Sequence, residues 1–234
     1  MTRVLVPVAV LEGESVAAGL MDLLGTMDVT VLGYHVLPEQ TPPDQAREQY
    51  EERAVSALDD LAEEFRAAGG DADSRLVFTQ DREKSIDRVA DEVDASAYAI
   101  TGATGDVDSL LVPVSGDVAV ERVVDFVAEL VGDRAIDVTL FLASEADDAG
   151  DRLAAAADRL RTDGVAVATE LVASDRPFDA LVDAVPGHDA IVMGEAAPSL
   201  SSFLLGDEAE RLASATVGPV LVVRNERDEE GDGD

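Results

Sequence analysis

Three short apolar segments occur twice along the chain in the same order, and this repeat limits the possible folds more than any other feature. The matched pairs are residues 4–8 with 110–114, residues 28–32 with 137–141, and residues 97–102 with 189–194. Three matches in one order are improbable by chance. The sequence therefore predicts a tandem duplication.

Each repeated segment is a nearly continuous apolar run rather than an alternation of apolar and polar residues. Such runs are expected when helices cover both faces of a parallel sheet. Between them, apolar residues recur at helical spacing, as in Leu58 and Phe65 of the first copy and Val123 and Val127 of the second. Strands that alternate with helices predict right-handed crossovers and an α/β fold of two doubly wound parallel half-domains.

The two copies differ in length. After Gly194 the second copy continues through a Ser-rich loop, a predicted helix near 208–213 and a predicted strand at 219–223, whereas only residues 103–108 follow the corresponding segment of the first. The first copy therefore lacks its fourth helix and fifth strand. The predicted organisation is a truncated domain over 1–106, a complete domain over 107–225 and a disordered acidic tail over 226–234.

The charge is extreme, because 50 acidic residues stand against 17 basic ones and give a formal net charge of −33. The acidic residues are spread among periodic apolar ones, unlike those of a disordered acidic segment. So much like charge destabilises a compact state unless salt screens it, which predicts adaptation to a salt-rich cytoplasm. The alternative, a nucleic-acid mimic that binds a basic partner, would gather its acids on one face, and the sequence shows no such grouping.

Composition also excludes several function classes. No Lys/Arg stripe is present to neutralise phosphates, which argues against nucleic-acid binding. No apolar run reaches the roughly 18 residues of a membrane span, the opening residues lack a signal-peptide pattern, and cysteine is absent. We expect a cytoplasmic protein without disulfides or a thiolate metal site.

Several segments together resemble the universal stress protein family, over residues 1 to about 225. The segments that carry the resemblance are residues 4–8, 34–38, 189–194, 201–206, 209–212 and 218–223. The resemblance implies a role in stress response. It also implies Rossmann-like domains of the adenine nucleotide alpha hydrolase type with strand order 3-2-1-4-5, the first of them lacking the fifth strand.

ATP-binding members of this family hold phosphates on a Gly-x-x-Gly loop after the fourth strand and on a later Gly-Ser or Gly-Thr at a helix start, where free N–H groups attract anions. In this chain the resemblance places the candidate nucleotide site in the second copy. Its candidate residues are Val114, Ser115, Gly116, Gly194, Ser199, Ser201, Ser202 and Gly206.

This loop departs from the family pattern. Ala197 replaces the second glycine, Asp207 replaces the Ser or Thr, and Glu195 lies inside the loop. Ser115 and Ala9 stand where the family commonly has an Asp after the first strand. A carboxylate ~4 Å from a phosphate costs ~4 kcal/mol at surface permittivity. Two of them would cancel most of the roughly 8 kcal/mol of a micromolar ligand.

We therefore predict a regulatory binding protein with a degenerate nucleotide site, no tightly bound cofactor and no turnover. The alternative is a stress protein that binds ATP with Mg²⁺ in its second copy and hydrolyses it slowly. His35 is predicted to pack and His188 to lie in a solvated loop. Residues 219–223 would form a sheet edge, which we expect to be covered either by the other copy or by a second chain, in a homodimer or another protein complex.

Overall fold

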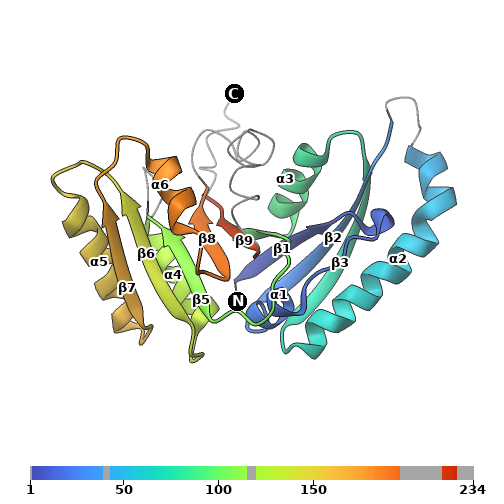
Figure 1. The fold of residues 1–234 in the computed structure, drawn as a ribbon. Helices are drawn as coiled ribbons and strands as arrows, with labels where there is room; N and C mark the ends of the chain where they lie inside the picture. The colour runs from blue at the N-terminus through green and yellow to red at the C-terminus, as the bar shows by residue number, and fades with distance from the viewer. Residues whose placement is uncertain (1, 39–42, 115–119, 196–217, 226–234) are drawn as a thin grey trace, which may run out of the picture.

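The computed structural model describes residues 2–38, 43–114, 120–195 and 218–225, over which strands and helices alternate (Figure 1). The strands of the first half are β1 (Arg3–Val8), β2 (Asp28–Val36), β3 (Asp71–Thr79) and β4 (Ala97–Ile100). Those of the second half are β5 (Ser109–Pro113), β6 (Asp137–Ala143), β7 (Val167–Val172), β8 (Ala190–Gly194) and β9 (Val220–Val223). The helices are η1 (Val10–Glu12), α1 (Ala18–Leu23), α2 (Pro43–Ala67), α3 (Arg82–Glu92), α4 (Val120–Val131), α5 (Ala149–Thr162) and α6 (Pro177–Ala184).

All nine described strands belong to one sheet with the order β3-β2-β1-β4-β9-β8-β5-β6-β7. Read inward from one edge, the first half has the order 3-2-1-4. Read inward from the other edge, the second half has 3-2-1-4-5. The predicted strand order and the missing fifth strand of the first half are thus confirmed. β1 and β5, which carry the repeated Val-Pro motif, each have parallel neighbours on both sides.

The last strand joins the two halves. β9 pairs in parallel with β8 and antiparallel with β4, where Ala97 lies opposite Val223 and Ile100 opposite Val220. The prediction that residues 219–223 offer a free edge to a second chain is therefore wrong, because both sides of this strand are already paired. β9 thus pairs with the otherwise exposed edge of β4, and both strand edges are covered by the same chain.

The antiparallel pair also decides where the two halves expose their strand ends. The strands β1 to β4 run opposite to β5, β8 and β9, because β4 and β9 pair antiparallel. Crevices at carboxyl ends are the usual ligand sites of such sheets. Each half thus has a candidate crevice of its own, at the carboxyl ends of its own strands.

Two apolar cores, one on each face of the sheet, cross the junction between the halves. One core packs under α1, α2, α4 and α5, with buried residues such as Leu20 and Val127, and the other under α3 and α6, with Ile86 and Leu181. Leu221 of β9 belongs to the first core and its neighbour Val222 to the second. Both cores therefore contain residues of both halves, which ties the stability of one to that of the other.

Two arginines add polar contacts across the junction. The guanidinium of Arg134, after α4, donates to the carbonyl oxygens of Asp22 (2.8 Å) and Leu23 (2.9 Å) at the end of α1. Arg224, after β9, donates to the carbonyl of Ala95 at 3.1 Å and to the carboxylate of Asp91. These bonds satisfy carbonyl groups that helix ends and turns leave without partners.

The strand pairing corrects one detail of the repeat. Val4 pairs with Ala97, and its counterpart Leu110 pairs with Ala190. The third repeated segment is therefore aligned one residue later than the sequence suggested, and Thr101, not Gly102, corresponds to Gly194. A four-residue apolar strand carries too little pattern to fix its register.

Other predictions fall outside the described residues, namely the helix near 208–213 and the acidic tail at 226–234. Among the helices of the described residues, none has the length and apolar character needed to cross a membrane.

Candidate functional site

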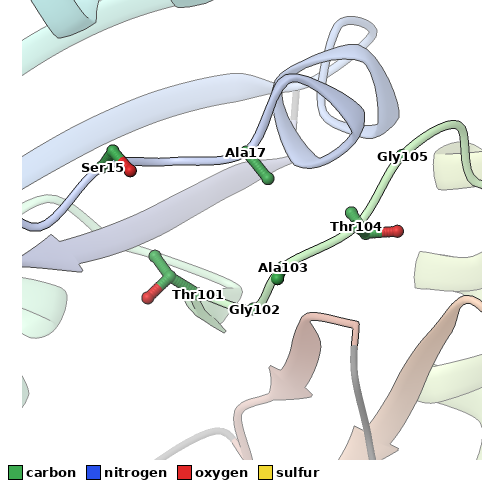
Figure 2. A pocket seen from close by; sticks show the side chains of 7 residues that line it. All are labelled: Ser15, Ala17, Thr101, Gly102, Ala103, Thr104 and Gly105. Atoms are coloured by element: carbon green, nitrogen blue, oxygen red, sulfur yellow. The ribbon is translucent and has the colours of Figure 1, made fainter.

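The first-half crevice lies at the carboxyl ends of β1 and β4, where the order of the strands reverses. It opens into a cavity of about 620 Å³ between the segment before α1 and the loop after β4 (Figure 2). The lining residues are Ser15, Ala17, Thr101, Gly102, Ala103, Thr104 and Gly105. Hydroxyl groups and backbone dominate this lining, and it contains no basic side chain.

The glycines of this loop serve close packing of the backbone. A Cβ atom on Gly102 would lie 2.4 Å from the carbonyl oxygen of Gly218, just before β9. A Cβ atom on Gly19 of α1 would lie 1.6 Å from the carbonyl oxygen of Gly105. The loop is thus pressed between α1 and the start of β9. These contacts explain the glycines at 102 and 19, whereas a Cβ atom on Gly105 would meet no other atom within 4 Å.

A carboxylate bridges the two strand ends of the first-half crevice. One oxygen of Glu14 accepts the backbone N–H of Ala9, directly after β1, at 2.7 Å. The other accepts the hydroxyl of Thr101, directly after β4, at 2.6 Å. Glu14 is half-buried, and both hydrogen bonds are charge-assisted, the stronger kind. The side chain therefore joins the ends of the two strands that form the crevice.

Aromatic side chains flank this end of the first half. The guanidinium of Arg82 lies 4.8 Å from the ring centroid of Tyr34. Burial raises the pKa of the Tyr34 hydroxyl; Arg82 opposes this rise, and Glu14 adds to it. The ring centroid of His35 lies 5.8 Å from that of Tyr50 and 6.2 Å from that of Phe78, which confirms its predicted packing role.

The other histidine differs from the prediction. His188 is partly buried, and its Nδ1 atom lies 3.1 Å from the carbonyl oxygen of Ala184, the last residue of α6. His188 therefore contacts the end of α6. The sequence did not indicate this contact, because His188 follows the turn residues Pro186 and Gly187.

The second-half crevice lies at the carboxyl ends of β5 and β8, and two of the predicted site residues are described there. Val114 is buried and donates its N–H to the carbonyl of Phe141 at 2.7 Å, while Gly194 is the buried last residue of β8. Because β5 and β8 are neighbouring parallel strands, these two residues lie at the same end of the sheet. The remaining predicted site residues, Ser115, Gly116, Ser199, Ser201, Ser202 and Gly206, lie outside the described residues.

Glu195 is bound on the β9 side of this crevice. Its carboxylate accepts the N–H of Asn225 at 3.0 Å, and its backbone carbonyl accepts the Asn225 side-chain amide at 2.8 Å. The pKa of Tyr98 is raised mainly by burial and secondly by the charge of Glu195. Tyr98 lies on β4, which pairs with the other side of β9. Glu195, one of the two carboxylates expected to repel a phosphate, is thus hydrogen-bonded on the side of β8 that faces away from β5. The other, Asp207, lies outside the described residues.

A smaller cavity of about 320 Å³ adjoins the second-half crevice through Val114. It lies between α4 and α5, and two arginines of α5, Arg152 and Arg159, line it together with Glu121 of α4 and apolar side chains. Arg159 is paired with Asp125 of α4 at 2.6 Å. Sequence analysis missed this pair of arginines, although their spacing of seven residues places them on one face of a helix.

The described residues hold no cluster of three or more His, Asp or Glu side chains that could bind a metal ion.

Comparisons with solved structures show which known fold this architecture shares. No family model and no curated protein sequence matches the chain. Among solved structures, a universal stress protein from Archaeoglobus fulgidus DSM 4304 superposes with a TM-score of 0.71, at 16% identity and with 97% of each chain covered. The fold is that of the universal stress proteins.

A second solved structure has the same architecture over most of its length. It is a functionally unknown protein from Pseudomonas aeruginosa PAO1, with a TM-score of 0.54, 14% identity, and coverage of 96% of this chain and 92% of that one. At these identities the likeness concerns the fold, so the ligand of this universal stress protein fold has to be argued from its own residues.

Proposed function

We infer that the chain is a regulatory binding protein of the universal stress type, whose ligand is an adenine nucleotide held weakly in the second-half crevice. It acts through the bound and unbound states of that site rather than by turnover. The observation that carries the proposal is the contrast between the crevices: the Glu14 carboxylate bridges the strand ends of one, while Val114 and Gly194 form the described part of the other.

Three features support the position of the site. Strand order reverses between β5 and β8, and open α/β sheets bind ligands at such points. Gly194 ends β8 without a side chain that would block a phosphate. The carboxylate of Glu195 is held by Asn225 on the opposite side of β8, away from β5.

Weak binding follows from the charges of the loop. A carboxylate ~4 Å from a phosphate costs ~4 kcal/mol at surface permittivity, and the sequence has Asp207 where the family pattern has Ser or Thr. This would weaken a micromolar ligand to roughly millimolar affinity, because each 1.4 kcal/mol is about tenfold. Residues 226–234 add further acidic charge to the chain, and molar salt would reduce the penalty.

Thermal unfolding of the full chain in molar salt, with Mg-ATP or AMP added, tests the proposal. At about tenfold excess over the dissociation constant, one bound ligand stabilises the fold by about 1.4 kcal/mol, which raises Tm by about 3–6 °C. Gly206→Glu adds a carboxylate to the proposed loop and should abolish the shift. Gly105→Glu is the matched control, because a Cβ atom there meets no other atom within 4 Å.

The outcomes separate the alternatives. A shift that Gly206→Glu removes and Gly105→Glu retains supports the proposed site. Saturation at micromolar ATP would favour the tight ATP-binding stress protein, and release of phosphate from ATP by that species would show turnover. The absence of any shift at tens of millimolar nucleotide would overturn nucleotide binding.

A further inference from the structure

We propose that Glu14 is a built-in occupant of the first-half crevice, and that its carboxylate takes the place of an anionic ligand and closes this crevice to phosphates. The inference deepens the proposed function, on which it rests for the position of the open site, and it adds that the chain binds one nucleotide rather than two.

The groups that Glu14 contacts are those that an incoming anion would need. The Ala9 N–H is the first backbone donor after β1, and the Thr101 hydroxyl is the first side-chain donor after β4. Backbone N–H groups and hydroxyls at the carboxyl ends of parallel strands form the polar contacts of ligands in such crevices. Glu14 binds one of each, with short hydrogen bonds of 2.7 Å and 2.6 Å.

The surroundings add to the effect of this carboxylate. Thr101, whose hydroxyl donates to Glu14, also lines the cavity, together with Ser15, Thr104 and the backbone of residues 102–105 (Figure 2). These lining residues include no cation that could offset the negative charge. A phosphate that reached Thr101 in this cavity would therefore approach the Glu14 carboxylate.

The described part of the second-half crevice has no carboxylate in the place of Glu14. Val114 follows β5 and Gly194 ends β8, while the carboxylate of Glu195 bonds to Asn225 on the β9 side. Residues 115–119, between β5 and α4, lie outside the described residues. Among the described residues, a carboxylate therefore joins the ends of the two central strands in the first half alone.

The test uses the full ¹⁵N-labelled chain in molar potassium chloride and inorganic phosphate as the probe. The amide resonances of Ala9, Thr101 and Gly105 report the first crevice, and those of Val114 and Gly194 report the second. In the wild-type protein, phosphate should leave the three first-half amides unchanged.

Two variants open the crevice. Glu14→Ala removes both the charge and the side chain that occupies the site. Phosphate should then shift the Ala9 and Thr101 amide resonances, with an affinity at least about fivefold above that of wild type. This factor is the effect of removing one carboxylate at ~4 Å under water-like screening. Glu14→Gln keeps the size and removes the charge, and should give a smaller gain. The control is Glu12→Ala, which removes the same charge from an exposed side chain that makes neither of the two hydrogen bonds.

Each outcome decides the inference. A gain in both Glu14 variants and none in Glu12→Ala supports it. Equal responses of wild type and variants, or lower stability of the variants without any phosphate response, would show that Glu14 only holds the loop and would overturn it. If Glu14→Ala does not fold, Glu14→Gln gives the same decision. A missing ATP response at Val114 and Gly194 would contradict the proposed function alone, because the first-half amides are read separately.

Discussion

The two crevices of this molecule are built from the same strand order and differ in what lies at their base. In the first half, Glu14 bridges the ends of β1 and β4 through Ala9 and Thr101. In the second half, the described ends of the matching strands are Val114 and Gly194, and no described carboxylate joins them. Topology therefore determines where a crevice forms, whereas the side chains at its strand ends determine which ligand charge it can accept.

The halves also differ in what they contribute to the junction. The second half supplies β9, and the first half supplies only the edge of β4 that β9 covers. Such a strand removes two exposed edges at once, which protects both halves from pairing with other chains. The comparison predicts that the halves unfold together and that damage at β9 reaches both.

The largest effect is expected from the shared strand. Leu221 is fully buried in the core that spans both halves, and Leu221→Ala should cost about 3 kcal/mol and lower Tm by about 6–12 °C. A single cooperative transition should remain in differential scanning calorimetry. Leu171→Ala on β7 is the control, because Leu171 is 48% exposed and should change stability little. Two separate transitions in the Leu221 variant would mean that the halves fold independently.

Removal of the Arg224 side chain should have the next largest effect. Arg224 is 10% exposed, and its guanidinium joins β9 to the first half through Ala95 and Asp91, so Arg224→Ala should cost about 2 kcal/mol in chemical denaturation. Arg88→Ala removes a 55% exposed guanidinium that pairs with Glu92 within α3, and should cost less than about 0.5 kcal/mol. Equal costs would show that the junction gains nothing from Arg224.

Arg134 tests the contact between α1 and α4. Lysine cannot donate to the carbonyls of both helices as the guanidinium does, so Arg134→Lys should cost about 1 kcal/mol. Burial lowers the pKa of Arg134, which remains charged at neutral pH. Hydrogen exchange should show faster opening of the last turn of α1. Unchanged exchange rates there would indicate that apolar packing alone holds the helix.

The smallest effect concerns a clamp found only in the second half. One oxygen of Asp189, before β8, accepts the Ser109 hydroxyl at 2.7 Å and the N–H groups of Ser109 (2.9 Å) and Asp108 (3.1 Å). The Ser109 hydroxyl above all lowers the pKa of Asp189. Ser96 occupies the matching place in the first half, where its N–H donates to the carbonyl of Arg3.

Because the folded pKa is lowered, Asp189 stabilises the fold above its unfolded pKa of about 3.9, and this contribution is lost as pH falls through the folded value. Asp189→Asn should therefore lower the free energy of unfolding at pH about 6 by less than about 1 kcal/mol, since the carboxylate is partly exposed to solvent, and the difference from wild type should shrink as the pH falls toward 2. Asp108→Asn is the control. A difference that persists undiminished at pH 2 would contradict the assignment.

Much of the fold was predictable from local pattern. Apolar runs marked the strands of the repeated segments and β9, and helical spacing marked α2 and α4, because both periods are visible within a few residues. The edge strands β3 and β7 were not marked, because they carry no continuous apolar run. The register of β4 was misjudged by one residue, since four apolar residues fit two alignments equally well. The site was located by Val114 and Gly194, while Glu14 was passed over as one of 50 acidic residues.

By itself, the sequence determined the alternation of strands and helices and the absence of a fifth strand from the first half, because both follow from the periodicity and order of apolar segments. The strand order within each half was implied by the resemblance to the universal stress protein family. Only the tertiary structure decided that β9 lies between β8 and β4, and that Glu14 reaches both Ala9 and Thr101. Both facts depend on contacts between residues far apart in the chain, and the partner of a strand edge or a carboxylate is not encoded by its neighbours in sequence.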